Sequence, residues 1–246
     1  MQYNYFHYPS ENLPPYGSVM YFAYRKLDTK TQQILYILDQ IKSQIISCTE
    51  LYNSPEVAQQ KTTWWLNEVN NINTNNTSSP QLNKLSQIFT KEILYQKLIT
   101  DINFSINSHY LNSKDIYNYF ANKFLGIETL KALYLNNFNN INHNEILQIN
   151  ANNEIIRHIF CIPKHFHNQI LLDSRISPNI TKQEFKDIAT QWLSIYKTIK
   201  VSKNLKPLIK ANQIHYKMAK KYIKSINNPF NEALDFSPLA LLFYSI

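Results

Sequence analysis

Apolar residues recur every three or four positions along most of this chain, which is the spacing of an amphipathic helix. After Asp28 the pattern runs through Ile34, Leu38, Ile41 and Ile45 and predicts a helix. The same spacing predicts further helices over residues 55–72, 80–89, 93–102, 113–134, 145–162, 181–196, 204–225 and 236–244. The pattern indicates an all-α protein.

Local signals mark where several of these helices begin and end. Ser54-Pro55 and Ser79-Pro80 each combine an N-cap residue with a proline at the first helical position. Thr181-x-x-Glu184 has the form of a capping box. Pro163 is expected to end the helix before it, and we expect a loop over 163–180 with a short extended piece at 170–172.

The scarcity of glycine supports the helical prediction. A chain of 246 residues would carry about 17 glycines at average usage, and this one has 2. Sheet proteins need glycine at tight turns, whereas glycine destabilises helices. We expect an irregular arm over residues 1–16 and a single all-α domain over 17–246.

The charge of the chain limits its partners and its location. The net charge is +8, yet only three of the 25 basic residues are arginine. Nucleic-acid recognition favours arginine, so we expect no nucleic-acid partner. The sequence has no apolar run long enough to cross a membrane and no evident signal peptide. We expect a cytoplasmic protein, with peripheral contact at the inner face of a membrane as an alternative.

Several motifs occur in the order and spacing of a known family. They are Gly17-Ser18-x-x-Tyr21-Phe22-Ala23, Thr63-Trp64-Trp65-Leu66-x-Glu68 and Tyr119-Phe120-Ala121-x-x-Phe124-Leu125-Gly126. With these motifs the chain resembles the squalene/phytoene synthase family over about residues 15–200. The resemblance implies an isoprenoid-synthase-like helical bundle around a central apolar cavity.

The chain lacks the acidic metal-binding motifs of this family. Members of that family bind Mg²⁺ and prenyl diphosphates through two Asp-x-x-x-Asp motifs, and this chain has no acidic pair spaced i, i+4. The resemblance places the degenerate motif positions at Ser43, Gln44, Ser47, His158 and Ile162. Such side chains supply too little negative charge for Mg²⁺. In this respect the chain resembles a branch of the family that includes the mitochondrial complex I assembly factor and its bacterial relatives.

The resemblance also implies candidate contacts for a ligand. Tyr21, Trp65, Tyr119 and Phe124 are candidates for lining the cavity, and Arg25 and Arg157 for holding a phosphate. For Tyr21 and Trp65 the structural alternative is ordinary core packing, and for Arg25 and Arg157 it is a salt bridge. His165 and His167 alternate but have no cysteine or acid nearby, so we expect no metal site there.

These observations leave three functional hypotheses. The first is a non-catalytic relative of the family that binds a prenyl or other lipid or acts as an assembly or interaction factor, with no cofactor and a lipid or protein partner. The second is a prenyltransferase that joins prenyl diphosphates with Mg²⁺ held by non-standard ligands. The third is a helical adaptor without a ligand.

Overall fold

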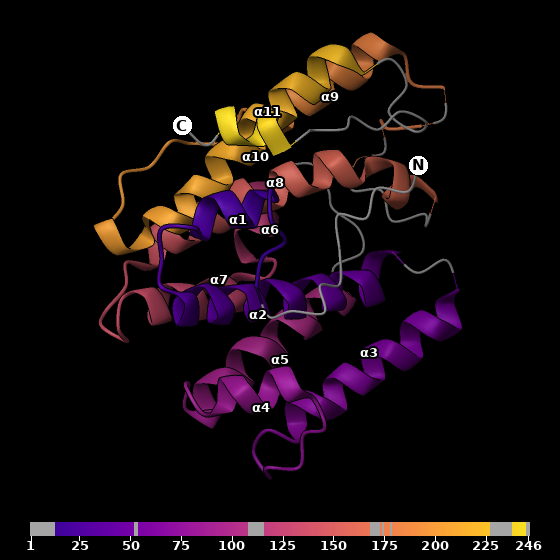
Figure 1. Ribbon diagram of the computed structural model, residues 1–246. Helices are drawn as coiled ribbons and strands as arrows, with labels where there is room; N and C mark the ends of the chain where they lie inside the picture. The colour runs from indigo at the N-terminus through magenta and orange to yellow at the C-terminus, as the bar shows by residue number, and fades with distance from the viewer. Residues whose placement is uncertain are drawn as a thin grey trace.

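The protein is all-helical, as the apolar periodicity predicts (Figure 1). The structure, a computed structural model, describes residues 13–51, 54–107, 116–167, 173, 175–177, 179–226 and 238–244, and these contain no β-strand. In chain order the helices are α1 (Val19–Tyr24), α2 (Thr29–Ile46), the π-helix η1 (Ser47–Leu51), α3 (Pro55–Asn70), α4 (Pro80–Ser86), α5 (Lys91–Asn107), α6 (Ile116–Asn122), α7 (Leu125–Leu135), α8 (His143–His167), α9 (Lys182–Leu193), the 3₁₀-helix η3 (Lys203–Leu205), α10 (Lys206–Ser225) and α11 (Pro238–Tyr244). Most of the predicted arm, residues 1–12, lies outside the described residues.

The predicted helix starts are confirmed by the bonds that cap them. The side chain of Asp28 accepts a hydrogen bond from the Thr31 amide, which begins α2. Ser54 and Ser79 cap α3 and α4 in the same way, each followed by proline. At α9 both bonds of the predicted capping box are present.

The helix predicted over 113–134 is instead two helices, α6 and α7. The chain breaks at Phe124, whose φ of 60° is left-handed. Two buried polar side chains from other helices stabilise this break. The Asn150 amide donates to the carbonyls of Phe120, Ala121 and Lys123 at the end of α6. The Asp101 carboxylate accepts hydrogen bonds from the first amides of α7 at 2.7 and 2.8 Å.

Gly126 explains how α7 can begin so close to α5. A Cβ atom at this position would lie 2.2 Å from the carbonyl oxygen of Lys97 in α5. Any larger residue would therefore push α7 away from Asp101, which holds its first turn. This close approach accounts for a glycine at 126 by packing alone.

Helix α8 continues past Pro163 to His167, so the prediction that Pro163 ends the helix is wrong. Proline in a helix interior costs about 3 kcal/mol because a backbone hydrogen bond is lost. On either side of Pro163, Ile162 is buried in the core and His165 Nε2 lies 2.9 Å from Glu50 Oε2. These contacts hold the last turn in place. The extended piece expected at 170–172 lies outside the described residues.

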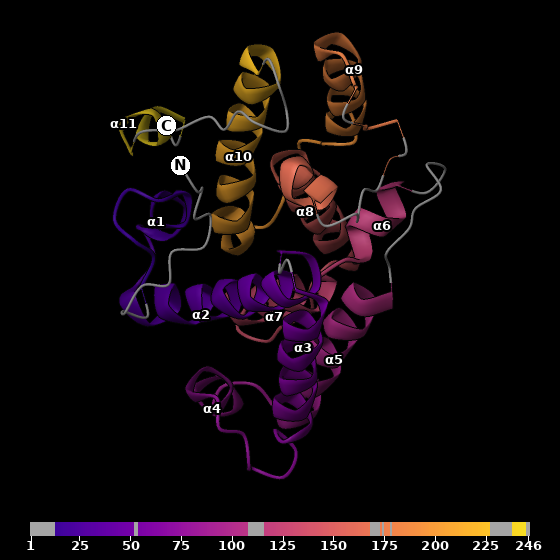
Figure 2. The same ribbon diagram turned by 90° about the vertical axis from the view of Figure 1, so that its right-hand side faces the viewer.

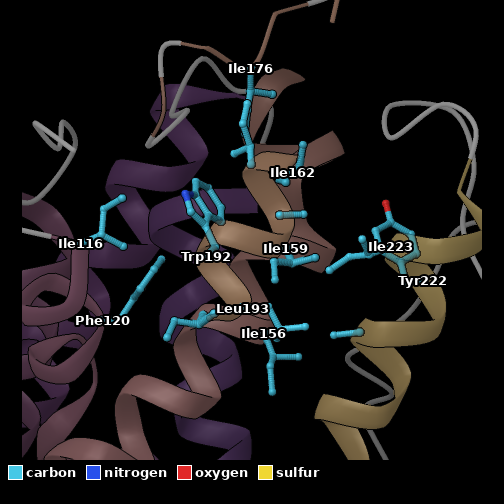
Figure 3. Packing of buried hydrophobic residues seen from close by; sticks show 14 of the residues in the cluster. Ile116, Phe120, Ile156, Ile159, Ile162, Ile176, Trp192, Leu193, Tyr222 and Ile223 are labelled. Carbon is cyan, nitrogen blue, oxygen red and sulfur yellow. The ribbon is translucent and has the colours of Figure 1, made fainter. Parts of the chain in front are cut away.

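The helices form two packed groups with α2 and α7 between them (Figures 1 and 2). On one side, α3, α4 and α5 pack with α2 and α7 around apolar residues such as Leu38, Leu85 and Leu98. On the other side, α6, α8, α9 and α10 share a second core, in which Trp192 lies beside Phe120 and Ile159 (Figure 3). Helices α1 and α11 pack against α10.

Candidate functional site

A pocket of about 480 Å³ lies between α1, α2, α8 and α10. Its two sides differ in chemistry. Helices α1, α10 and α11 contribute mostly apolar side chains, including Val19, Met20, Leu208, Ala211, Met218 and Leu241. Helices α2, α7 and α8 contribute most of the charged and polar ones, including Asp39, Lys42, Ser43, Gln44, Glu128, Lys131, Glu154 and Arg157. The pocket can therefore accept a molecule with an apolar part and a polar part.

Buried ion pairs lie along the polar side of this pocket. Lys42 Nζ is 2.8 Å from Glu154 Oε1 and 3.3 Å from Glu128 Oε1. Lys131 Nζ is 2.5 Å from Asp39 Oδ1 and 3.1 Å from the same Glu128 oxygen. The two lysines thus link three carboxylates from α2, α7 and α8.

Arg157 extends this arrangement to Glu50 in η1. Its guanidinium nitrogens lie 2.7 Å from Glu154 Oε2 and 2.5 Å from Glu50 Oε2. Lys123 forms a further ion pair with Glu50. The resulting ionic cluster contains Asp39, Glu50, Glu128 and Glu154 together with Lys42, Lys123, Lys131 and Arg157. Its formal charges cancel.

The cations keep these carboxylates ionised despite their burial. Burial by itself raises the pKa of Glu50, but Arg157 and Lys123 outweigh it, and the pKa lies well below the ordinary value. Burial likewise opposes ionisation of Glu128 and Glu154. Their neighbouring cations, Lys131 and Lys42 for Glu128 and Arg157 and Lys42 for Glu154, still leave both pKa values lowered. Each of these negative charges is therefore already matched by a cation of the protein.

The degenerate motif positions do not all meet at one place. Ser43 and Gln44 line the pocket together with Arg157. The Ser47 hydroxyl donates to the backbone carbonyl of Ser43, four residues earlier in the helix, at 2.9 Å. His158 and Ile162 are buried side chains that do not line the pocket. The structure thus brings the first predicted segment to Arg157 but not to His158.

Of the six predicted ligand contacts, Arg157 alone is among the residues that line the pocket. Tyr21 packs against Tyr16 and Phe22, and Arg25 lies over the Phe22 ring. Trp65 belongs to the core formed with α2. Tyr119 accepts a hydrogen bond from Lys123.

Phe124, the remaining candidate, is fully buried beneath the ionic cluster. Lys42 lies 5.4 Å from the centre of its ring, and Lys123 and Arg157 each lie 5.9 Å away. Cations at this distance from an aromatic face are stabilised by it. Phe124 therefore supports the cluster from below.

Glu50, His158 and His165 have donor atoms within 4.8 Å of one another, a spacing that a metal ion could use. Their surroundings oppose that use. Glu50 is already paired with Lys123 and Arg157. Burial lowers the pKa of His158, and Arg157 and Lys123 lower it further. A divalent cation here would face two fixed positive charges, so this trio fits a metal poorly.

Glu128 and His215 each have a polar side-chain atom that forms no hydrogen bond with a described residue. Glu128 is 1% exposed, and its Oε2 atom accepts no hydrogen bond. His215 on α10 also lines the pocket, and no described residue forms a hydrogen bond or ion pair with its ring. Burial lowers the pKa of His215 to about 4, with further lowering by Lys42 and Lys131, so the ring is neutral near pH 7.

The acids of the ionic cluster come from different helices, so the pattern of acid pairs within one helix does not reveal it. The sequence feature that indicates the cluster is a charged residue at a position of the helical repeat that is otherwise apolar. Lys42 follows the buried Leu38 by four residues, and Glu128 and Lys131 follow the buried Phe124 and Ile127 in the same way. Residues four apart lie on the same helix face, so these charged side chains face the protein interior.

Comparisons with protein-family models, with curated proteins and with solved structures find no match. Within the described residues, none of the helices combines the length and the apolar character that crossing a membrane requires.

Proposed function

We propose that the protein binds a lipid with an apolar chain, such as a prenyl chain, in the pocket between α1, α2, α8 and α10, and that it does not catalyse prenyl transfer. The observation that carries the proposal is the contrast between the two sides of the pocket. An apolar side formed by residues such as Val19, Ala211 and Met218 suits the chain, and the polar side suits a head group. The volume of about 480 Å³ falls within the usual range for small-molecule sites.

The ionic cluster supports the non-catalytic part of the proposal. A prenyltransferase needs carboxylates that are available to Mg²⁺. Asp39, Glu128 and Glu154 line the pocket and could supply the non-standard ligands of the alternative enzyme hypothesis. Each is instead paired with a lysine or arginine of the protein. Metal binding would have to separate buried ion pairs, which is costly.

Native mass spectrometry of the purified protein tests the proposal. We expect a non-covalent lipid mass on the wild type, or uptake of lipid after incubation with farnesol or phosphatidylglycerol. Ala211→Trp fills the pocket from α10 and should abolish the adduct, while Gln59→Trp at an exposed position of α3 should retain it. Circular dichroism confirms that both variants fold, and Met218→Trp serves as a second filling variant. A wild type that neither carries nor takes up any lipid contradicts the proposal.

Binding of another protein is a second candidate function, and Trp64 on α3 favours it. Its side chain is 43% exposed and packs edge-on against the buried Trp65, with ring centres 5.1 Å apart. Exposed tryptophans are frequent at the centres of protein interfaces. Trp64 lies outside the pocket, so Trp64→Ala should leave lipid uptake unchanged. A pull-down that loses a partner with Trp64→Ala, but not with the neighbouring Gln60→Ala, would support this role.

A further inference from the structure

Helix α10 carries all of its lysines on one face. With about 3.6 residues per turn, they fall within a stripe about 100° wide that runs from the first residue of the helix to its last turn. This lysine stripe contains Lys206, Lys210, Lys217, Lys220, Lys221 and Lys224. The opposite face of α10 is buried, and Leu208, Ala211 and Met218 on it line the pocket.

The positive charge of the lysine stripe is not balanced within the helix. The 20 residues of α10 include no aspartate or glutamate. Lysines four apart, such as Lys220 and Lys224, repel each other, and Lys206 at the start of the helix opposes the helix dipole. Within the part of the chain that the structure describes, no ion pair is formed by Lys206, Lys210, Lys217, Lys220 or Lys224. The stripe therefore offers uncompensated positive charge to an anionic partner.

Helix α1 adds further cations beside the stripe. This helix packs against α10 (Figure 2), and Arg25 and Lys26, which follow its last residue, are exposed. Partial burial lowers the pKa of Lys210, and Lys217, Lys26 and Arg25 lower it further. These four cations thus lie near one another, and the positive surface spans two helices.

Exposed aromatic side chains accompany this positive surface. Phe243 of α11 is 64% exposed, and the backbone carbonyl of the next residue, Tyr244, accepts a hydrogen bond from Lys217. Tyr16, which precedes α1 and lines the pocket, is 87% exposed. Phenylalanine and tyrosine side chains of this kind enter the boundary between the headgroups and acyl chains of a bilayer. Nucleic-acid recognition favours the arginine fork, which this lysine-rich surface lacks except at Arg25.

We propose that the lysine stripe, together with Arg25, Lys26 and Phe243, docks the protein on an anionic lipid bilayer. Lysine clusters of this size on an amphipathic helix bind anionic headgroups. None of the six lysines lines the pocket, so docking does not require a ligand there and goes beyond the proposed function. Docking also brings Tyr16, at the edge of the pocket, close to the lipids.

Co-sedimentation with vesicles tests the proposal on the full chain. The wild type should bind phosphatidylcholine vesicles that contain about a third phosphatidylglycerol, and should bind pure phosphatidylcholine vesicles at least about tenfold more weakly. Added salt should weaken the binding because it screens exposed charges. A wild type that does not bind the anionic vesicles at low salt contradicts the proposal, and one that binds duplex DNA instead would reassign the surface to nucleic acid.

A triple variant of the lysine stripe locates the docking surface. Lys206→Gln/Lys220→Gln/Lys224→Gln changes three exposed side chains. It should weaken binding to the anionic vesicles by about a hundredfold at low salt, since each lysine near such a surface contributes about fivefold. Circular dichroism confirms that the variant folds.

The matched control removes the same charge on the other side of α2 and α7. Lys61→Gln/Lys84→Gln/Lys91→Gln lies on α3, α4 and α5, which Figure 2 shows at the opposite end of the molecule from α10. This control should bind the anionic vesicles nearly as well as the wild type. Equal losses for the two triple variants would show that net charge alone drives the binding, and they would overturn the docking surface.

Two single variants separate docking from the lipid pocket. Phe243→Ser should weaken vesicle binding at high salt as well as at low salt, because the ring contributes through burial and not through charge. An unchanged affinity would remove Phe243 from the docking surface. Ala211→Trp, which fills the pocket, should retain vesicle binding. If vesicles bind while no lipid adduct forms, the proposed function fails and docking stands, and the reverse result overturns docking alone.

Discussion

Helix α2 contributes to two layers of opposite character. One set of its residues, including Ile34, Leu38 and Ile41, packs into the apolar cluster shared with α3, α4, α5 and α7. Another set, Asp39 and Lys42, enters the ionic cluster with α7 and α8. In the apolar cluster each side chain contributes through the surface it buries. In the ionic cluster the residues depend on one another, since a charge is tolerated there only while its partner is present.

The largest expected effect on stability comes from removing the Glu50 carboxylate from the ionic cluster. Glu50→Leu leaves Lys123 and Arg157 without this carboxylate, and removing one partner of a buried pair costs about 3–5 kcal/mol. Urea unfolding measures the loss. The double variant Glu50→Leu/Lys123→Met should be less destabilised than the sum of the two single variants. A loss below about 1 kcal/mol for Glu50→Leu would mean that the charges act independently.

The matching change in the apolar cluster is Leu38→Ala. Leu38 is fully buried, and its truncation should cost about 2–5 kcal/mol through lost burial and the cavity left behind. Leu38→Met keeps the volume and should cost less than about 1.5 kcal/mol. Equal losses for the two variants in urea unfolding would argue against tight packing at this position.

A fall in pH should weaken the stabilisation that comes from the ionic cluster but not that from the apolar cluster. The pKa of Glu50 is lowered in the folded protein, so the unfolded chain takes up a proton first as the pH falls through the ordinary value of 4.5. The stabilisation from Glu50 is complete above that pH and is lost as the pH falls toward the folded pKa. The free-energy difference between wild type and Glu50→Leu should therefore shrink in acid, while the difference for Leu38→Ala stays constant. Parallel pH curves for the two variants would contradict this distinction.

The smallest expected effect on stability is at the capping box of α9, outside both the ionic and the apolar cluster. Thr181→Ala removes the hydroxyl that accepts from the Glu184 amide, which should cost about 1 kcal/mol. Thr181→Ser keeps the hydroxyl and should restore most of this stability in thermal unfolding. This pair calibrates how much an exposed local contact contributes compared with the two buried clusters.

The difference between local and long-range contacts explains which features the sequence could predict. Helix starts such as Thr181 and Ser54 depend on neighbours within a few residues, and they were predicted correctly. The break at Phe124 depends on Asp101 and Asn150, which arrive from other helices. The continuation of α8 past Pro163 likewise involves a bond to Glu50, more than a hundred residues away. Local patterns do not contain such contacts.

The candidate site was predicted less completely than the fold for the same reason. The acids of the ionic cluster come from α2, η1, α7 and α8, so a search for pairs within one helix does not find them. Ser43, Gln44 and Arg157, which the resemblance named as two motif positions and a ligand contact, line the pocket. The aromatic candidates Trp65 and Phe124 occupy core positions instead, which for Trp65 was the structural alternative.

We infer that the carboxylates beside the pocket are neutralised by the cations of the protein and are not available to Mg²⁺. Carbon-13 NMR of the side-chain carboxyl groups tests it directly. Glu50, Glu128 and Glu154 should titrate below the ordinary value of 4.5 without added metal, and adding MgCl₂ with farnesyl diphosphate should leave their signals unmoved. A shift of these signals that saturates with Mg²⁺ would show that the ion pairs open to bind metal, and it would contradict the account.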